Sequence, residues 1–346
     1  MKLLPSLRAF TNKRHDKKAV LAAAAACQEL LDCMHEHVAW AEFQHWAFVA
    51  ITRLATDRHH LACLSDAGCC EAVVAALESH WKNSAIQHWG CRALALLAAH
   101  TDNDARPCMT RACAVVLAAL RGHEDDEEVQ HHAVRALAGL AFTTLPNRAT
   151  LIRGGACARL IAAMATFPHS ADVALAALRA MAALAQDEDA AAGLGADGAC
   201  GAVLAALSAH PARADLQVWG LMAVGALASD AANRGALGAG GGAARAVAAA
   251  LRRHASDRAV QRWGLWAAAE LGRGDVANAR ALAAAGVGGA ARAAARAHRG
   301  DAEVQRACQR LAAEGLVGGV VAGEASALGS RFTCARRAGG AARVRI

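Results

Sequence analysis

Histidine and cysteine are the side chains of this sequence best suited to hold a metal ion or to act as a nucleophile. The chain has 16 His and 12 Cys. The closest-spaced group is His59, His60, Cys63, Cys69 and Cys70. Zinc sites made of cysteine usually contain a Cys-x-x-Cys pair, which the sequence lacks. We therefore expect cysteines that behave as small buried apolar residues, with no metal site and no Cys-His nucleophile.

Several histidines recur at one place, near the end of a predicted helix in each segment of the chain. A cation or a hydrogen-bond donor is favoured there by the helix dipole and by the free carbonyls of the last turn. This structural role is our interpretation, rather than a metal site or a pH switch. The residues concerned are His80, His123, His210, His254 and His298, with His169 slightly displaced.

No pattern in the sequence indicates catalysis. The acidic run at residues 124–128 precedes a predicted helix, where acids are favoured in the first turn. Two glycine-rich stretches, at residues 238–242 and 286–289, neither follow a strand nor continue into Gly-Lys-Ser/Thr, so they do not resemble phosphate-binding loops. No Ser-His-Asp set or paired carboxylates stand out. We expect a protein without enzymatic activity and without a cofactor.

The strongest regularity is an internal repeat with a period of roughly 43–44 residues, the length range of helical solenoid repeats. Segments such as the one from Gln87 and the one from Gln217 share a Gln-x-Trp-Gly start and an Ala-Leu-rich continuation. If the Gln is position zero, position +3 is small and position +10 is nearly always Leu. These positions predict the buried face of a helix. The Gln slots are Gln44, Gln87, Gln130, Gln217, Gln261 and Gln305, with Ala174 in the remaining one.

Each segment contains two further predicted helices. About 13 residues after the Gln comes a short one, for example around Asn147 or Asn233, where we expect the Asn to cap the helix. A glycine turn and a longer apolar helix follow. Such a three-helix unit cannot bury its own apolar face and must stack on copies of itself. The glycines at 225, 264 and 272 lie inside predicted helices, so we expect the last three units to open first.

Positions +2, +5 and +9 form a second face, rich in Trp and Arg. These residue types dominate binding hot spots because Trp buries a large area and Arg makes forked hydrogen bonds. The face predicts a groove for an acidic and hydrophobic segment. The alternative is that each Trp at position +2 only covers the seam between adjacent third helices. The candidate residues are Trp46, Trp89, Arg92, Arg135, Arg179, Trp219, Trp263 and Trp266.

Composition and charge narrow the class of protein. With 55% hydrophobic residues, only 4% aromatic residues and no Tyr, the chain favours helices over sheets. No uninterrupted apolar stretch is long enough to cross a membrane. The net charge of +7 is concentrated near the two ends, which leaves a slightly acidic body and disfavours nucleic-acid binding along it.

The repeat resembles the armadillo family, whose three-helix units have Gly-Ala after the first helix and a third helix that opens with Val-Gln. Gly155-Ala156, Val129-Gln130 and Val260-Gln261 match those places. The Gln-x-Trp-Gly variant is most similar to armadillo segments of Roco-type leucine-rich-repeat kinases. Peptide-binding members such as importin alpha carry Asn at position +9. No Asn occurs at that position here, so we do not expect that ladder of contacts.

The sequence therefore predicts an all-α, armadillo-like right-handed solenoid of about seven three-helix repeats over residues 17–315. A basic segment (1–16) precedes it and a Gly/Arg-rich tail (316–346), expected to be disordered, follows it. The resemblance implies a scaffold that binds an intracellular protein along its concave groove. The alternatives are a nucleic-acid-binding solenoid and a regulatory module of a larger signalling enzyme. We expect a cytoplasmic location, with the nucleus or an organellar presequence as alternatives.

Overall fold

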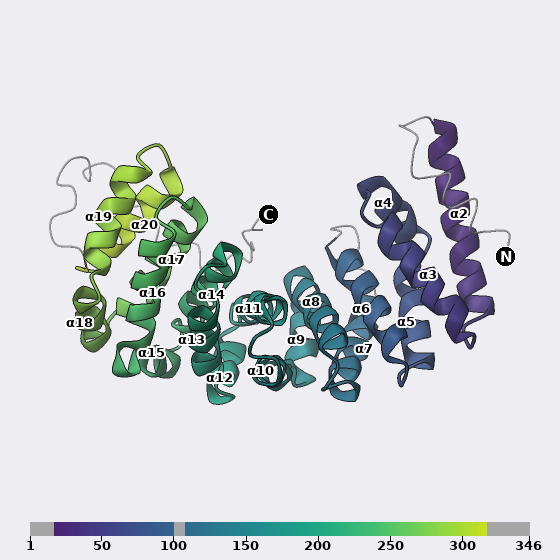
Figure 1. Cartoon of the computed structure of the whole chain (residues 1–346), viewed down its shortest axis with the longest axis horizontal. Coiled ribbons are helices and arrows are strands. Elements are labelled where there is room, and N and C mark those ends of the chain that lie inside the picture. The colour runs from purple at the N-terminus through teal and green to yellow at the C-terminus, as the bar shows by residue number, and fades with distance from the viewer. Residues whose placement is uncertain (1–16, 100–107, 317–346) are drawn as a thin grey trace.

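The computed structural model describes residues 17–99 and 108–316, and within them every regular element is a helix (Figure 1). The third helices of the repeats, which start near the Gln slots, are α3 (Ala41–Leu54), α6 (Ser84–Ala98), α8 (Glu127–Thr143), α11 (Ala171–Leu184), α14 (Ala214–Leu227), α17 (Arg258–Gly272) and α20 (Ala302–Ala313). The basic segment 1–16 and the tail beyond Leu316 lie outside the described residues.

The other helices form two more stacks. The second helices are α2 (Lys17–Glu36), α5 (Cys69–Ser79), α7 (Cys108–Gly122), α10 (Ala156–Thr166), α13 (Ala199–Ala209), α16 (Gly242–Arg253) and α19 (Val287–Ala297). The first helices are α4 (Arg58–Asp66), α9 (Leu145–Arg153), α12 (Glu188–Ala196), α15 (Ala231–Gly238), followed by the 3-10 turn η3 (Ala239–Gly241), and α18 (Val276–Ala284).

Equivalent helices of neighbouring units pack against each other along the whole array. The third helices contact one another in the order α3, α6, α8, α11, α14, α17 and α20. The units follow an arc, with α8, α11 and α14 on its inner side and α10 and α12 on its outer side (Figure 1). The predicted all-α solenoid is confirmed.

Helix starts are set by short polar side chains and by glycine. Asp57 accepts hydrogen bonds from the amides of His59 and His60 at the start of α4. A glycine in the left-handed region precedes each described second helix after a short first helix, as Gly68 does with φ of 84°. Only glycine adopts that conformation without strain, so the sharp turn between first and second helices needs it.

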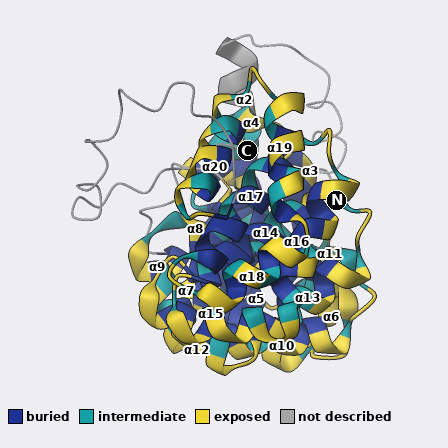
Figure 2. Ribbon diagram, turned by 90° about the vertical axis from the view of Figure 1, so that its left-hand side faces the viewer, coloured by how far each residue is buried: buried dark blue, intermediate teal, exposed yellow. Residues whose placement is uncertain are grey.

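The core runs continuously along the array between the helix layers (Figure 2). Leu97 and Leu140, at position +10, have no exposed surface, as the repeat pattern predicts. The small residue at position +3 is confirmed as a point of close approach. A Cβ atom on Gly90 would lie 2.5 Å from the Leu77 side chain of α5, and one on Gly220 would lie 2.4 Å from Leu207 of α13.

The Gln at position zero ties the second helix of each unit to the third. The Gln130 side-chain amide donates to the carbonyls of Leu120 and His123, each at 2.9 Å. The same pair of bonds, to carbonyls ten and seven residues back, recurs at the five other Gln slots. The residue that defines the repeat in sequence therefore satisfies carbonyls that the end of the second helix leaves free.

Changing this Gln tests its structural role. Replacing Gln130 by Ala is expected to lower the free energy of unfolding by about 1–3 kcal/mol, because two largely buried carbonyls lose their donor. The reverse change, Ala174→Gln, is expected to raise it, since unit four lacks these bonds. Urea unfolding followed by circular dichroism measures both. Equal stability of Gln130→Ala and the unmodified chain would contradict the proposed role.

The recurring histidines link neighbouring units. His80 Nε2 lies 2.7 Å from the Val38 carbonyl, and His123 Nε2 lies 2.8 Å from the Trp81 carbonyl, both one unit upstream. His254 and His298 make the equivalent bond. The structural interpretation holds for these four histidines. Their hydrogen-bond partner, however, is a backbone carbonyl in the turn of the preceding unit and not one in their own helix. His210 Nε2 has no such partner.

The predicted Asn caps are wrong. Thr144 and Asp230 cap α9 and α15, and the Asn three residues later is buried inside the helix. The Asn233 side chain instead donates to the Ala191 carbonyl of the preceding unit at 2.7 Å. It fills the space above Gly195, where a Cβ atom would lie 1.5 Å from Asn233 Oδ1. The Asn233 side chain thus bonds two units together, in space left free by a glycine of the preceding unit.

In the stretches that the structure describes, no single helix is both long and apolar enough to cross a membrane. The bent pairs α4 with α5 and α12 with α13 would meet the length and composition requirements only when each pair is taken together.

Candidate protein-binding face

The surface formed by positions +2, +5 and +9 of the third helices, here called the inner face, carries all the candidate binding residues. Trp46 is the most exposed of its tryptophans, at 53%. Trp89, Trp219 and Trp263 are half-buried, so each of them both contacts a neighbour and presents an edge to solvent. Among the arginines, Arg135 is exposed, and Arg92 and Arg179 are half-buried.

Arginine and tryptophan stack on this face. The Arg92 guanidinium carbon lies 5.0 Å from the centre of the Trp89 ring in the same helix. The Arg179 guanidinium carbon of α11 lies 5.1 Å from the Trp219 ring of α14, across a unit boundary. Phe142 also contacts this indole edge to face, with ring centres 5.7 Å apart. Such contacts hold the guanidinium planes in place while their N–H groups remain available to a ligand.

The three central arginines form a row of positive charge. Within the described residues, the ion pairs of arginine side chains involve other positions than Arg92, Arg135 and Arg179. Burial, and then the neighbouring Arg135 guanidinium, lower the pKa of Arg179. Since the positive charges of Arg135 and Arg179 act on each other, an anion placed between them would be stabilised by both.

The C-terminal end of the inner face is different. Glu270, at position +9 of α17, is buried, and its carboxylate pairs with Arg310 of α20 and with Arg273 at 2.9 Å. The Arg310 guanidinium, at position +5 of the following unit, is therefore neutralised. Trp266 packs over Gly225 of α14, where a Cβ atom would lie 2.1 Å from its ring. Trp266, at position +5, thus fills the seam between α14 and α17.

The cysteines lie mostly in the core. Nine of the eleven described cysteines are buried and all eleven are free. Burial raises the pKa of the Cys91 thiol to about 12 and that of Cys27 to about 11. A thiol with such a pKa is hardly ionised near neutral pH and is a poor nucleophile.

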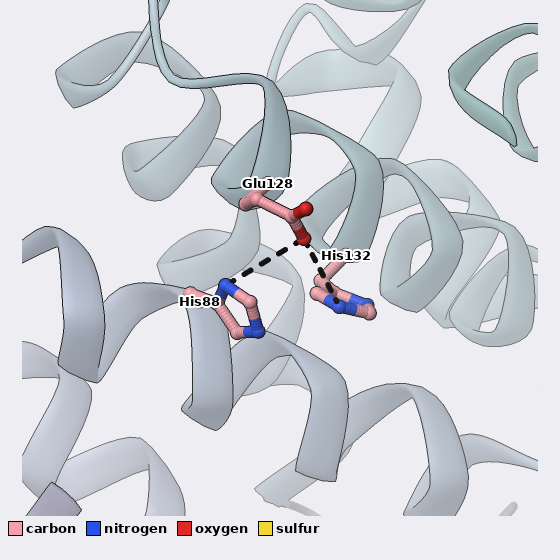
Figure 3. Close-up of side chains that lie close together, drawn as sticks. All are labelled: His88, Glu128 and His132. Carbon is pink, nitrogen blue, oxygen red and sulfur yellow. Dashed lines mark ion pairs between the residues drawn. The ribbon is translucent and has the colours of Figure 1, made fainter. Parts of the chain in front are cut away.

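The sequence reasoning missed one group of potential ligands. His88, Glu128 and His132 place a ring nitrogen, a carboxylate oxygen and a ring nitrogen within 4.8 Å of one another, and all three side chains point toward a common centre (Figure 3). His59, His60, Cys63, Cys69 and Cys70, the group considered from sequence, are not brought together in this way. Two spacings in the sequence could have indicated this group. Glu128 and His132 are four residues apart, so they share one side of a helix. His88 lies one repeat period before His131, the residue next to His132.

Solved structures define the class of this fold. An engineered protein matches with 23% identity and a TM-score of 0.70, over 87% of this chain and 71% of that one. A designed armadillo repeat protein in complex with the peptide (KR)4 matches with 21% identity and a TM-score of 0.57, over 70% of this chain and 97% of that one. A structure concerned with the interaction between cadherin and beta-catenin matches with 15% identity and a TM-score of 0.60, over 86% and 69%.

Comparison of the sequence with family models gives a match. Residues 15–177 match the family model described as LRRK2 ARM repeat. The chain has the armadillo-repeat fold, and its N-terminal half is similar to the family that this model describes. Both levels of the resemblance inferred from the Gln-x-Trp-Gly units are thereby confirmed. No curated protein sequence matches the chain.

Proposed function

We propose that this protein is a non-enzymatic intracellular scaffold whose inner face binds an extended, acidic and partly hydrophobic segment of a partner protein. The observation that carries the proposal is the row formed by Arg92, Arg135 and Arg179. Two of these side chains are held against tryptophan rings, and none is neutralised by a carboxylate in the described residues. Fixed guanidinium groups without internal partners are well placed for forked hydrogen bonds to carboxylates.

The spacing of the row suits an extended chain. Packed helices lie about 8–10 Å apart, so successive arginines at position +5 are separated by about that distance. An extended strand covers it in about three residues at roughly 3.3 Å each. A segment with a carboxylate at every third position would therefore contact all three arginines. Apolar side chains on either side of it would reach Trp89 and Trp219.

The similar solved structures support binding of a peptide or protein. The charge of the inner face distinguishes this chain from one of those structures. The designed armadillo protein was solved with the peptide (KR)4, which is basic. A basic peptide on the inner face of the present chain would meet the like charges of Arg92, Arg135 and Arg179. We therefore infer that the ligand of this face has the opposite charge.

Peptide binding measured by fluorescence anisotropy tests the proposal. The probe is a labelled 12-residue peptide with Glu at every third position and Leu near both ends, and (Lys-Arg)4 is the comparison peptide. We expect the acidic peptide to bind and the basic one not to bind. Changing Arg92, Arg135 and Arg179 to Glu is expected to weaken binding by more than about tenfold, because three charge-assisted contacts become repulsive.

The matched control changes Arg121, Arg153 and Arg296 to Glu, which alters the net charge equally on exposed positions outside the inner face. It should retain binding, and circular dichroism should show both variants folded. If both variants lost peptide binding equally, the cause would be the change in net charge and not the loss of the arginine row. Undiminished binding by the inner-face variant would show that the arginine row is structural. Tight RNA binding by residues 19–330 would favour the nucleic-acid alternative.

A further inference from the structure

We propose that His88, Glu128 and His132 form a binding site for one divalent transition-metal ion of the zinc class, between the third helices α6 and α8. This proposal does not depend on the binding of a partner at the inner face.

The three side chains are presented by two packed helices. Glu128 and His132 are four residues apart on α8, so they lie on the same side of that helix, one turn apart. His88 comes from α6, the preceding third helix, which packs against α8. Because helices hold ligands more precisely than loops do, this arrangement is preformed, as a metal site requires.

The distances leave room for an ion rather than for direct bonds. Glu128 Oε2 lies 3.8 Å from His88 Nδ1 and 4.0 Å from His132 Nε2, and both distances exceed a hydrogen bond. In a tetrahedral zinc site with bonds of about 2.0–2.1 Å, ligand atoms lie roughly 3.3 Å apart. The set must therefore contract by well under about 1 Å along these two edges. Glu128 is exposed and can move to achieve it.

The imidazoles are otherwise poorly satisfied. His132 is only 6% exposed, and its Nδ1 atom is buried without a hydrogen-bond partner. His88 Nε2 and the neighbouring His131 Nδ1 are buried and unpartnered as well. In His88 and His132 these are not the nitrogens that would coordinate an ion. The coordinating atoms are His88 Nδ1 and His132 Nε2, which lie nearest to Glu128 Oε2.

The ligand set and its surroundings select the kind of ion. Two imidazoles and one carboxylate suit zinc, nickel or copper, whereas calcium and magnesium require oxygen ligands. The Arg92 and Arg135 guanidinium groups disfavour a cation held by charge alone. The repulsion from these two guanidinium groups weakens binding less when the ion is held by coordinate bonds to nitrogen. Three protein ligands leave the fourth tetrahedral position to water, beside the exposed Glu128 carboxylate.

Metal titration of the full chain, freed of metal by a chelator, tests the site. Cobalt(II) is the spectroscopic probe and zinc the calorimetric one. We expect one ion per chain, visible cobalt bands, and no sulfur-to-metal charge-transfer band in the near ultraviolet. Glu128→Gln and His88→Gln should each weaken binding by at least about tenfold. Zinc should raise the melting temperature of the unmodified chain more than that of either variant.

The matched controls are His45→Gln, which changes the same repeat position one unit earlier, and Glu127→Gln, which changes the adjacent acid. Both should bind the ion as the unmodified chain does. Glu128 is exposed, so its variant will fold, and circular dichroism checks this for each protein. No saturable binding, binding with thiolate bands, or equal affinity in the two site variants and the controls would overturn the proposal.

Discussion

Replacing Leu97 by Ala is expected to lower the free energy of unfolding by about 2–5 kcal/mol. Leu97 occupies position +10 of α6, has no exposed surface, and belongs to the continuous core. Removing its terminal carbons leaves a cavity that rigid helices on either side cannot close. Chemical denaturation followed by the helical circular dichroism signal measures the change. In a repeat array the loss is expected to be concentrated in the units that contact α6.

Leu145→Ala is the control for this experiment. Leu145 is 69% exposed at the start of α9, so its truncation should change stability by no more than about 0.5 kcal/mol. If the two substitutions had equal effects, position +10 would not be the buried anchor that the repeat indicates. The site variants that change Arg92, Arg135 and Arg179 should resemble Leu145→Ala in stability, since these side chains lie outside the core.

Replacing Gly225 by Ala is expected to destabilise the protein by about 1–3 kcal/mol, the usual effect of overpacking a close contact. From sequence alone the opposite result follows, because Ala in a helix is about 0.5–1 kcal/mol more favourable than Gly. The sign reverses because the new methyl group would lie 2.1 Å from the Trp266 ring, which cannot move away without opening the seam. Thermal unfolding of the Gly225→Ala protein shows whether the substitution destabilises the protein, as the structure indicates, or stabilises it, as the sequence alone suggests.

Gly201→Ala is the matched control, since Gly201 also lies inside a helix, α13, but a methyl group added there would meet no atom within 4 Å. It should be stabilising. A second variant, Gly225→Ala combined with Trp266→Leu, should recover part of the loss, because the smaller side chain frees the space. A stabilised Gly225→Ala protein would show that the seam is loose and that the sequence-based expectation of weak C-terminal units holds.

The fold was predictable because its signal repeats. One Gln-x-Trp-Gly segment would be ambiguous, but six Gln slots at nearly constant spacing identify a stacked three-helix unit and place its buried positions. The candidate inner face followed from the same register. Its Trp and Arg residues were found by position, and the structure adds that Arg179 reaches Trp219 of the next unit while Trp266 fills a seam.

What the sequence determined by itself was local or periodic: helices from an Ala-rich composition, turns from glycine, and one buried face per unit from the spacing of Leu. What only the tertiary structure decided depends on partners one period away. The Asn233 bond to Ala191, the contact of Gly225 with Trp266, and the convergence of His88 with Glu128 and His132 all cross a unit boundary. The rotation and offset between stacked units arise from packing of many side chains at once, so no local pattern specifies which atoms meet there.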